Sequence, residues 1–129
     1  YGTSAALLYI DLDGFKQVND ANGHAAGDAV LRAVSAVLTR HVRASDVVAR
    51  LGGDEFGLLL WQLSEPDARR KGAELEAALG RTTAIHAGVA LAVGASAGVA
   101  RLLPLDRPSD VLERADRDMY ARKTARKTR

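Results

Sequence analysis

A Gly-Gly pair followed by two acids interrupts an apolar stretch near the middle of the chain, and it is the feature that most limits the fold. Mostly apolar segments at 47–51 and 56–60 flank the sequence Gly52-Gly53-Asp54-Glu55. Short apolar runs around Gly-Gly are typical of a β-hairpin, in which the glycines supply the positive φ angles of a tight turn. An apolar hairpin has no structural need for two adjacent acids at its tip. Asp54 and Glu55 therefore either keep the turn soluble or belong to a functional site.

The segment 5–13 predicts a buried strand that ends in acidic residues. Its residues alternate between two sides, with Leu7, Tyr9, Asp11 and Asp13 on one and Leu8, Ile10 and Leu12 on the other. Two acids on the same side at the end of a strand suit a cation. We expect Asp11 to be a ligand, whereas Asp13 precedes a predicted helix and is expected to cap it.

Apolar periodicity and breaker residues predict the remaining elements. Helices are expected at 14–21, 26–42, 64–79 and from Ser109, a predicted N-cap, into the tail; strands are expected at 47–51, 56–61, 82–86 and 89–103. Asp28 lies in the first turn of helix 26–42, where a carboxylate interacts favourably with the helix dipole even without another role. Helices mixed with a hairpin predict an α/β (α+β) sandwich with a mainly antiparallel sheet.

The composition fits one globular domain. The 129 residues are 47% hydrophobic and 26% charged and contain no cysteine, which excludes disulfides and thiolate metal sites. The sequence has no apolar run long enough to span a bilayer and no signal peptide at its start. We therefore expect a cytoplasmic domain, with a membrane anchor elsewhere in the parent protein left open. Because the chain opens directly on a strand, we also expect it to be a piece of a longer multidomain protein.

Basic residues are concentrated at the C-terminal end. The formal net charge is +2, but five of the 18 basic residues lie in segment 122–129, which has no acid and leaves 13 basic and 16 acidic residues elsewhere. Such a tail is either a solvated helix end or a site for a phosphate or another anion. Because the rest of the chain is not basic and only 5% of residues are aromatic, the pattern does not favour a nucleic-acid-binding protein.

Three acids would converge if the strand 5–13 lay beside the predicted hairpin. Asp11, Asp54 and Glu55 would then form an oxygen-only cluster of the kind that selects Mg²⁺ or Mn²⁺. Two such ions about 3.5–4 Å apart activate an attacking oxygen and stabilise a leaving one. Together with a basic tail for phosphates, this cluster predicts phosphoryl or nucleotidyl transfer.

The segment Gly52-Gly53-Asp54-Glu55-Phe56 resembles the signature of GGDEF domains, the diguanylate cyclases. Further motifs follow the family's order and spacing over essentially the whole chain: Asp11-Leu-Asp-Gly-Phe-Lys16, Val18-Asn-Asp20, Gly23-His24, Gly27-Asp28, Ser96-Ala-Gly-Val99 and Arg114-Ala-Asp-Arg-Asp-Met-Tyr120. The resemblance implies a mainly antiparallel, five-stranded central sheet surrounded by helices, similar to nucleotide cyclase and polymerase palm domains. The helix and motif that open the family's domain are missing from this sequence, which agrees with a piece of a longer protein.

The resemblance also implies a reaction and its partners. Two GTP molecules condense into cyclic di-GMP with release of two pyrophosphates, and because each domain holds one GTP, the active unit is a homodimer. Two alternatives stay open. The domain would be a catalytically weak or silent receptor for GTP or cyclic di-GMP, or a regulatory module joined to an upstream sensor or a downstream phosphodiesterase domain.

Family roles transfer to individual residues of this sequence. The resemblance implies two Mg²⁺ or Mn²⁺ ions per active site, held by Asp11, the backbone carbonyl of Leu12, Asp54 and Glu55. It implies that Asp54 also acts near the ribose 3′-hydroxyl and that Lys16 stabilises developing charge. The implied substrate contacts are Asn19 and Asp28 for guanine, and Phe15, Gly52, Gly53, Lys123 and Lys127 around the phosphates.

The C-terminal tail departs from the family pattern. After the phosphate-binding Lys123 the family usually has Gly-Arg-Asn, whereas this chain has Arg126-Lys127-Thr128. Lys127 would replace an arginine as a point charge without a bidentate fork, and Arg126 would substitute only with a backbone shift of one residue. We expect weaker GTP binding from this change.

The segment Arg43-Ala-Ser-Asp46 matches the family's inhibitory RxxD site for cyclic di-GMP at the family's distance from the signature. A guanidinium suits a phosphate or a guanine edge, and a carboxylate suits guanine donors. An ordinary Arg–Asp surface pair is the alternative. The helix after the hairpin has Glu74 where a second arginine is often found, with Arg69 and Arg70 nearby, so we expect weak product inhibition.

Overall fold

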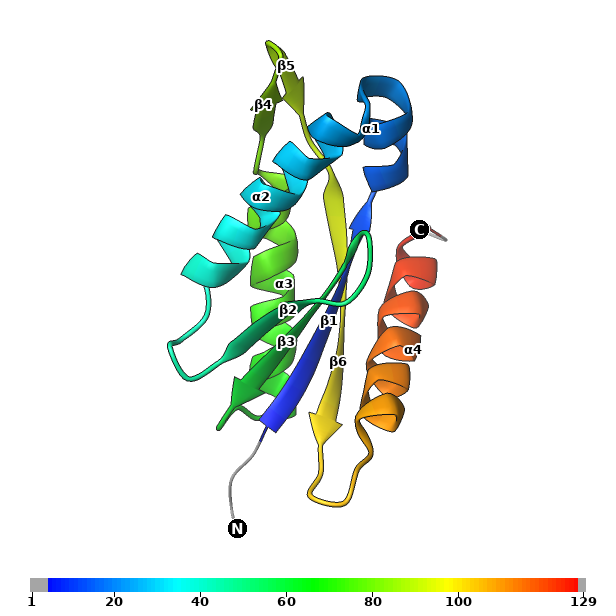
Figure 1. Ribbon diagram of the computed structural model, residues 1–129. Helices are drawn as coiled ribbons and strands as arrows, with labels where there is room; N and C mark the ends of the chain where they lie inside the picture. Colours follow the sequence, from blue (N-terminus) through cyan, green and yellow to red (C-terminus); the bar gives the residue numbers. More distant parts are fainter. Residues whose placement is uncertain (1–4, 128–129) are drawn as a thin grey trace.

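Four antiparallel strands form the central sheet in the order β2-β3-β1-β6 (Figure 1). The computed structural model describes residues 5–127, with side chains to residue 126. The strands of this sheet are β1 (Ala5–Asp13), β2 (Val47–Arg50), β3 (Glu55–Trp61) and β6 (Gly94–Leu102). The predicted α/β class with a mainly antiparallel sheet is confirmed. Within the described residues the sheet has four strands, one fewer than the resemblance implied.

The segment expected as one strand at 89–103 is broken into two strands that belong to different sheets. Its first part, β5 (Val89–Leu91), pairs only with β4 (Ala84–His86) in a separate hairpin. Ala87 and Gly88 connect the two strands with φ angles of 50° and 78°. Positive φ at both turn residues favours a tight two-residue hairpin. Local pairing therefore keeps β4 and β5 apart from the central sheet.

Helices cover both faces of the sheet, as the resemblance implied. The helices of the described residues are α1 (Phe15–Asn22), α2 (His24–Arg40), α3 (Glu65–Gly80) and α4 (Pro108–Lys127). On one face Leu8 and Ile10 pack in the main core with residues of α1, α2 and α3; on the other, Tyr9 packs against α4 (Figure 1). No helix within residues 5–127 is both long enough and apolar enough to span a membrane.

The Gly-Gly turn between β2 and β3 has a different geometry from the predicted one. Within the described residues, the glycines with positive φ are Gly14, Gly23 and Gly88, so the prediction of positive φ at Gly52 and Gly53 is wrong. The backbone N–H of Leu51 donates to the carbonyl of Glu55 at 2.8 Å. The reversal is thus spread over residues 52–54, and no residue of the turn needs the left-handed region.

Two predicted helix caps are also wrong. Helix α1 begins at Phe15 with Gly14 as the N-cap, in the left-handed conformation at φ 85°, and no side chain caps this helix. The carboxylate of Asp13 instead accepts the hydroxyl of Ser96 from β6. Helix α4 begins at Pro108, one residue before Ser109, because proline fits the first turn of a helix without losing a hydrogen bond.

The contact between β6 and α4 depends on Gly98, which leads to a stability prediction. A Cβ at this position would lie 2.2 Å from the carbonyl oxygen of Ala115 and 2.4 Å from the backbone nitrogen of Met119. We expect Gly98→Ala to lower the free energy of unfolding by about 1–3 kcal/mol in urea denaturation, because helix backbone must move. Gly80→Ala, with no atom within 4 Å of the added Cβ, is the matched control. Equal stability of both variants and the wild type would contradict this account of the packing.

Candidate active site

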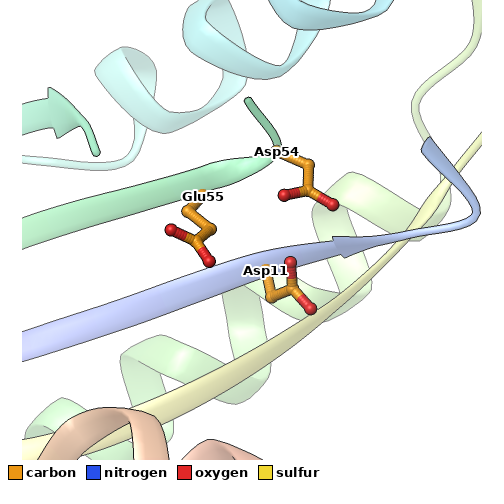
Figure 2. Close-up of side chains that lie close together, drawn as sticks. All are labelled: Asp11, Asp54 and Glu55. Carbon is orange, nitrogen blue, oxygen red and sulfur yellow. The ribbon is translucent and has the colours of Figure 1, made fainter. Parts of the chain in front are cut away.

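Three carboxylates meet where β1 and β3 lie side by side. In the antiparallel register Asp11 is the partner of Glu55, and Asp54 directly precedes β3. One carboxylate oxygen from each residue lies within 4.8 Å of the others, and all three residues are half-buried (Figure 2). The structure thus brings together the three acids singled out in the sequence.

Backbone and side-chain contacts hold the acidic turn against β1. The backbone N–H of Leu12 donates to the carbonyl of Asp54 at 2.9 Å. The guanidinium of Arg50 donates to the carbonyls of Gly52 and Gly53 at 2.9 and 3.0 Å. A Cβ on Gly52 would lie 2.8 Å from Oε2 of Glu55, whereas a Cβ on Gly53 would meet nothing within 4 Å. Gly52 therefore leaves room for the Glu55 carboxylate, a role that the sequence did not indicate.

The electrostatics of the cluster favour a bound cation. Burial raises the pKa of Asp11, the negative charge of Asp54 raises it further, and Lys123 opposes both effects. Burial also raises the pKa of Tyr9, as does its hydrogen bond with Glu55, so this phenol stays protonated. Oxygen-only donors that repel one another fit a hard divalent cation such as Mg²⁺ or Mn²⁺. The three carboxylates therefore fit Mg²⁺ or Mn²⁺, the ions expected from the sequence.

Lys123 reaches the cluster from α4 on the other side. Its Nζ lies 2.9 Å from Oδ1 of Asp13 and 3.4 Å from Oδ2 of Asp11. The hydrogen bond to Asp13 raises the pKa of Lys123, which keeps the ammonium charged. Sequence reasoning missed Asp13 as part of the site. The alternation that places Asp13 on the same side of β1 as Asp11 was the signal that could have found it.

A cleft of about 550 Å³ opens beside the carboxylates, where β1 passes into α1. This volume suits a small-molecule ligand. Ten residues line it: Asp11, Leu12, Asp13, Gly14, Phe15, Lys16, Gln17, Asp54, Lys123 and Arg126. Phe15 and Lys16, two of the predicted site residues, thus lie at the cleft, although the Phe15 side chain is mostly buried in the core. Glu55, Gly52 and Gly53 are not among the lining residues.

Asn19 and Asp28 lie outside this cleft. The amide of Asn19 on α1 packs against Gly27 of α2, so closely that a Cβ on Gly27 would be 1.9 Å from its Oδ1. This Oδ1 atom is buried and has no hydrogen-bond partner within the described residues. Asp28 is exposed and lines a second hollow of about 370 Å³ together with Arg50. The side chain of Lys127 falls outside the described residues.

Arg43 and Asp46 form a pair at the far end of the hairpin from the acids. Oδ2 of Asp46 accepts the backbone N–H and the Nε of Arg43 at 3.0 and 3.3 Å, and Oδ1 accepts the backbone N–H of Trp61 at 3.1 Å. Arg43 also donates to the carbonyl of Trp61. Burial opposes ionisation of Asp46, but these hydrogen bonds outweigh it and lower the pKa of the carboxyl. Only 3% of the Asp46 side chain is exposed, against 53% for Arg43.

The residues considered for a second inhibitory arginine are engaged on α3 and α4. Arg69 pairs with Glu65 and with Asp118, at 3.1 and 2.9 Å. Arg70 pairs with Asp67, and Glu74 pairs with Lys71. The structure therefore does not add Arg69 or Arg70 to the pair formed by Arg43 and Asp46.

Known proteins resemble this chain in both sequence and structure. The family model "Diguanylate cyclase, GGDEF domain" matches residues 1–129. The probable diguanylate cyclase DgcE of Escherichia coli K12 is 44% identical over 119 residues, covering 92% of this chain and 11% of DgcE. The diguanylate cyclase TpbB of Pseudomonas aeruginosa is 41% identical over 128 residues, covering 96% of this chain and 29% of TpbB. The chain thus spans less than a third of these two relatives.

Solved structures agree with the sequence relatives. The GGDEF domain of DgcB from Caulobacter crescentus, solved in complex with c-di-GMP, superposes with a TM-score of 0.86 at 30% identity, covering 96% of this chain and 74% of that one. The diguanylate cyclase SiaD of Pseudomonas aeruginosa, solved with its activator SiaC, gives a TM-score of 0.87 at 34% identity, covering 95% and 47%. With a family model matching its entire length, the chain belongs to the diguanylate cyclase GGDEF domain family.

Proposed function

We propose that this domain is a diguanylate cyclase that condenses two GTP molecules into cyclic di-GMP and two pyrophosphates. The observation that carries the proposal is the cluster of Asp11, Asp54 and Glu55, whose carboxylates meet beside a cleft of about 550 Å³. Lysines line the same cleft, so acids for a metal and cations for phosphates lie together. The diguanylate cyclase names of the relatives support this activity.

The metal in this proposal is Mg²⁺ or Mn²⁺, with two ions per site. The ligands of these ions would be the carboxylates of Asp11, Asp54 and Glu55 and the backbone carbonyl of Leu12. Bound there, the metal would supply Lewis-acid stabilisation of the phosphates and of the attacking oxygen.

The chain's own residues supply the remaining functions. Asp54 lies beside the reacting ribose 3′-hydroxyl and assists the loss of its proton. That oxygen forms a bond to the α-phosphorus of the GTP on a partner domain, and the bond to pyrophosphate breaks. Lys16 and Lys123 neutralise charge that develops on the phosphates. In a second step of the same kind, the 3′-hydroxyl from the partner domain's GTP attacks the α-phosphorus of the first GTP and closes the ring. Because each domain holds one GTP, the reaction requires a homodimer.

Guanine is recognised at the corner between α1 and α2 in this proposal. The buried Oδ1 of Asn19 lacks a partner within the described residues, and the exposed carboxylate of Asp28 is an acceptor for the N1–H and amino group of guanine. Adenine lacks this pair of donors, so the two residues favour guanine. Phe15 lies next to the triphosphate, Gly52 and Gly53 let the backbone approach the phosphates, and Lys127 supplies a further positive charge to the phosphates.

The pair of Arg43 and Asp46 is the proposed inhibitory site for cyclic di-GMP. The exposed guanidinium of Arg43 offers donors to a phosphate or a guanine edge, while Asp46 holds the arginine in place. Because these two relatives are several times longer than this chain, the proposal includes a sensor or phosphodiesterase domain in the parent protein. It also keeps the cytoplasmic location expected from the sequence.

Neutralising Glu55 tests the catalytic assignment. Glu55→Gln keeps the size of the side chain but removes the charge, so cyclic di-GMP formation should fall by more than about 100-fold. The product is measured by chromatography with GTP and Mg²⁺, with the domain fused to a dimerising segment. Glu74→Gln, the same substitution at an exposed site on α3, should retain the wild-type rate. An unchanged rate in Glu55→Gln would reject the assignment. A wild type that binds GTP or cyclic di-GMP without forming product would instead identify a receptor.

Truncating Arg43 tests the inhibitory site. Arg43→Ala should keep the initial rate and lose inhibition by added cyclic di-GMP, because the guanidinium that contacts the nucleotide is gone. Initial rates are compared at increasing concentrations of cyclic di-GMP. Arg40→Ala, at an exposed position near the end of α2, serves as the control and should remain inhibited. Inhibition that persists unchanged in Arg43→Ala, or a wild type that is not inhibited at all, would refute this part of the proposal.

A further inference from the structure

Arg126 on α4 is held between two other elements at the edge of the cleft. One of its guanidinium nitrogens lies 3.1 Å from Oε2 of Glu76 on α3, and the other donates to Oγ of Ser96 on β6 at 2.6 Å. The Glu76 carboxylate also accepts the backbone N–H of Ala97 at 2.9 Å, which ties it to the sheet. The arginine is therefore fixed on both sides rather than free in solvent.

Ser96 connects this arginine to the acids of the candidate active site. Its side chain is fully buried, and its Oγ lies 2.9 Å from Oδ2 of Asp13. A hydroxyl has one proton, and since Asp13 as a carboxylate can only accept, that proton points to Asp13 and a lone pair faces Arg126. Asp13 also binds Lys123 at 2.9 Å. These contacts fix the orientation of the Arg126 guanidinium relative to the cluster of Asp11, Asp54 and Glu55.

The charges around Glu76 leave a positive excess beside the cleft. Glu76 pairs with Arg126 at 3.1 Å and with Arg122 at 3.6 Å, so one carboxylate faces two guanidinium groups. Lys123 has the opposite surroundings, because its ammonium faces both Asp11 and Asp13. The positive excess thus lies around Glu76, whereas the charge of Lys123 is already matched by two acids.

Of these two arginines, Arg126 is the one that lines the cleft. Nearly half of its side chain, 46%, is exposed, and it lines the cavity together with Lys16 and Lys123. Arg122 contacts the same Glu76 without being among the lining residues. Arg126 also stands where the GGDEF pattern usually has glycine. This chain therefore has an arginine, held by Glu76 and Ser96, at a position where the GGDEF pattern usually has no side chain.

We propose that Arg126 is a substrate-binding residue that contacts the phosphate tail of a nucleoside triphosphate. The inference rests on the proposed function, since it places the nucleotide in this cleft. A guanidinium is a donor only and binds phosphate oxygens through two parallel N–H groups. Glu76 and Ser96 already fix the Arg126 side chain, so this side chain loses less conformational entropy when a phosphate binds. Arg126 would contact the phosphates from its own position on α4, without the backbone shift that a direct replacement of the family's arginine would need.

Binding measurements on the whole domain separate this role from a structural one. Calorimetry in the presence of Mg²⁺ compares a non-hydrolysable GTP analogue with GMP, which lacks the two outer phosphates. Arg126→Ala should weaken binding of the analogue by about 10- to 100-fold, the effect of losing a charge-assisted hydrogen bond, and leave GMP binding unchanged. Arg126→Lys keeps the charge without the fork and should give an intermediate loss.

Arg122→Ala is the matched control, because it removes the other partner of Glu76 and should leave both ligands bound as in the wild type. Analogue binding that is unchanged in Arg126→Ala and Arg126→Lys would overturn the inference while the proposed function stands. Equal losses for GMP and the analogue would overturn it too, because the damage would then be to the whole site. A wild type that binds neither the analogue nor GTP would reject the proposed function itself.

Discussion

The antiparallel register between β1 and β3 is the constraint on which the rest of the site depends. It sets Asp11 opposite Glu55, and the hydrogen bond from the N–H of Leu12 to the carbonyl of Asp54 fixes the turn that precedes β3. A shift of one residue would turn every side chain of β1 to the other face and would separate the three carboxylates. The apolar residues of β1 prevent such a shift, because Leu8 and Ile10 are almost completely buried in the main core.

The acids and bases around this register compensate one another across three elements. Lys123 of α4 bridges Asp11 and Asp13 on β1, while Glu76 of α3 bridges Arg122 and Arg126 of α4. Burial and the negative charge of Asp54 still raise the pKa of Asp11 against the effect of Lys123, so the carboxylate cluster favours a divalent cation. The same ion pairs bind the end of α4 to β1 and α3, so the proposed substrate site and the docking of the helix share one set of charges.

Local patterns were enough to predict the class of fold and the family, and they predicted the meeting of the three acids on the condition that β1 lies beside the hairpin. Alternation in β1 and the hairpin signal fixed which side chains share a face, and the register then brought them together. Interactions between distant segments were not predictable in this way. Asp13 was assigned to a local helix cap, but its partner Ser96 lies 83 residues away. The packing of Asn19 on Gly27 likewise depends on a contact between two helices, α1 and α2.

The central claim is that these carboxylates and the adjoining cleft condense GTP between two domains. The most direct measurement incubates the dimerised wild-type domain with GTP and Mg²⁺ and quantifies cyclic di-GMP and pyrophosphate together. The account predicts one cyclic di-GMP and two pyrophosphates for every two GTP consumed, and no product when the divalent cation is chelated. Intact GTP at high protein concentration, or pyrophosphate released without cyclic di-GMP, would contradict it.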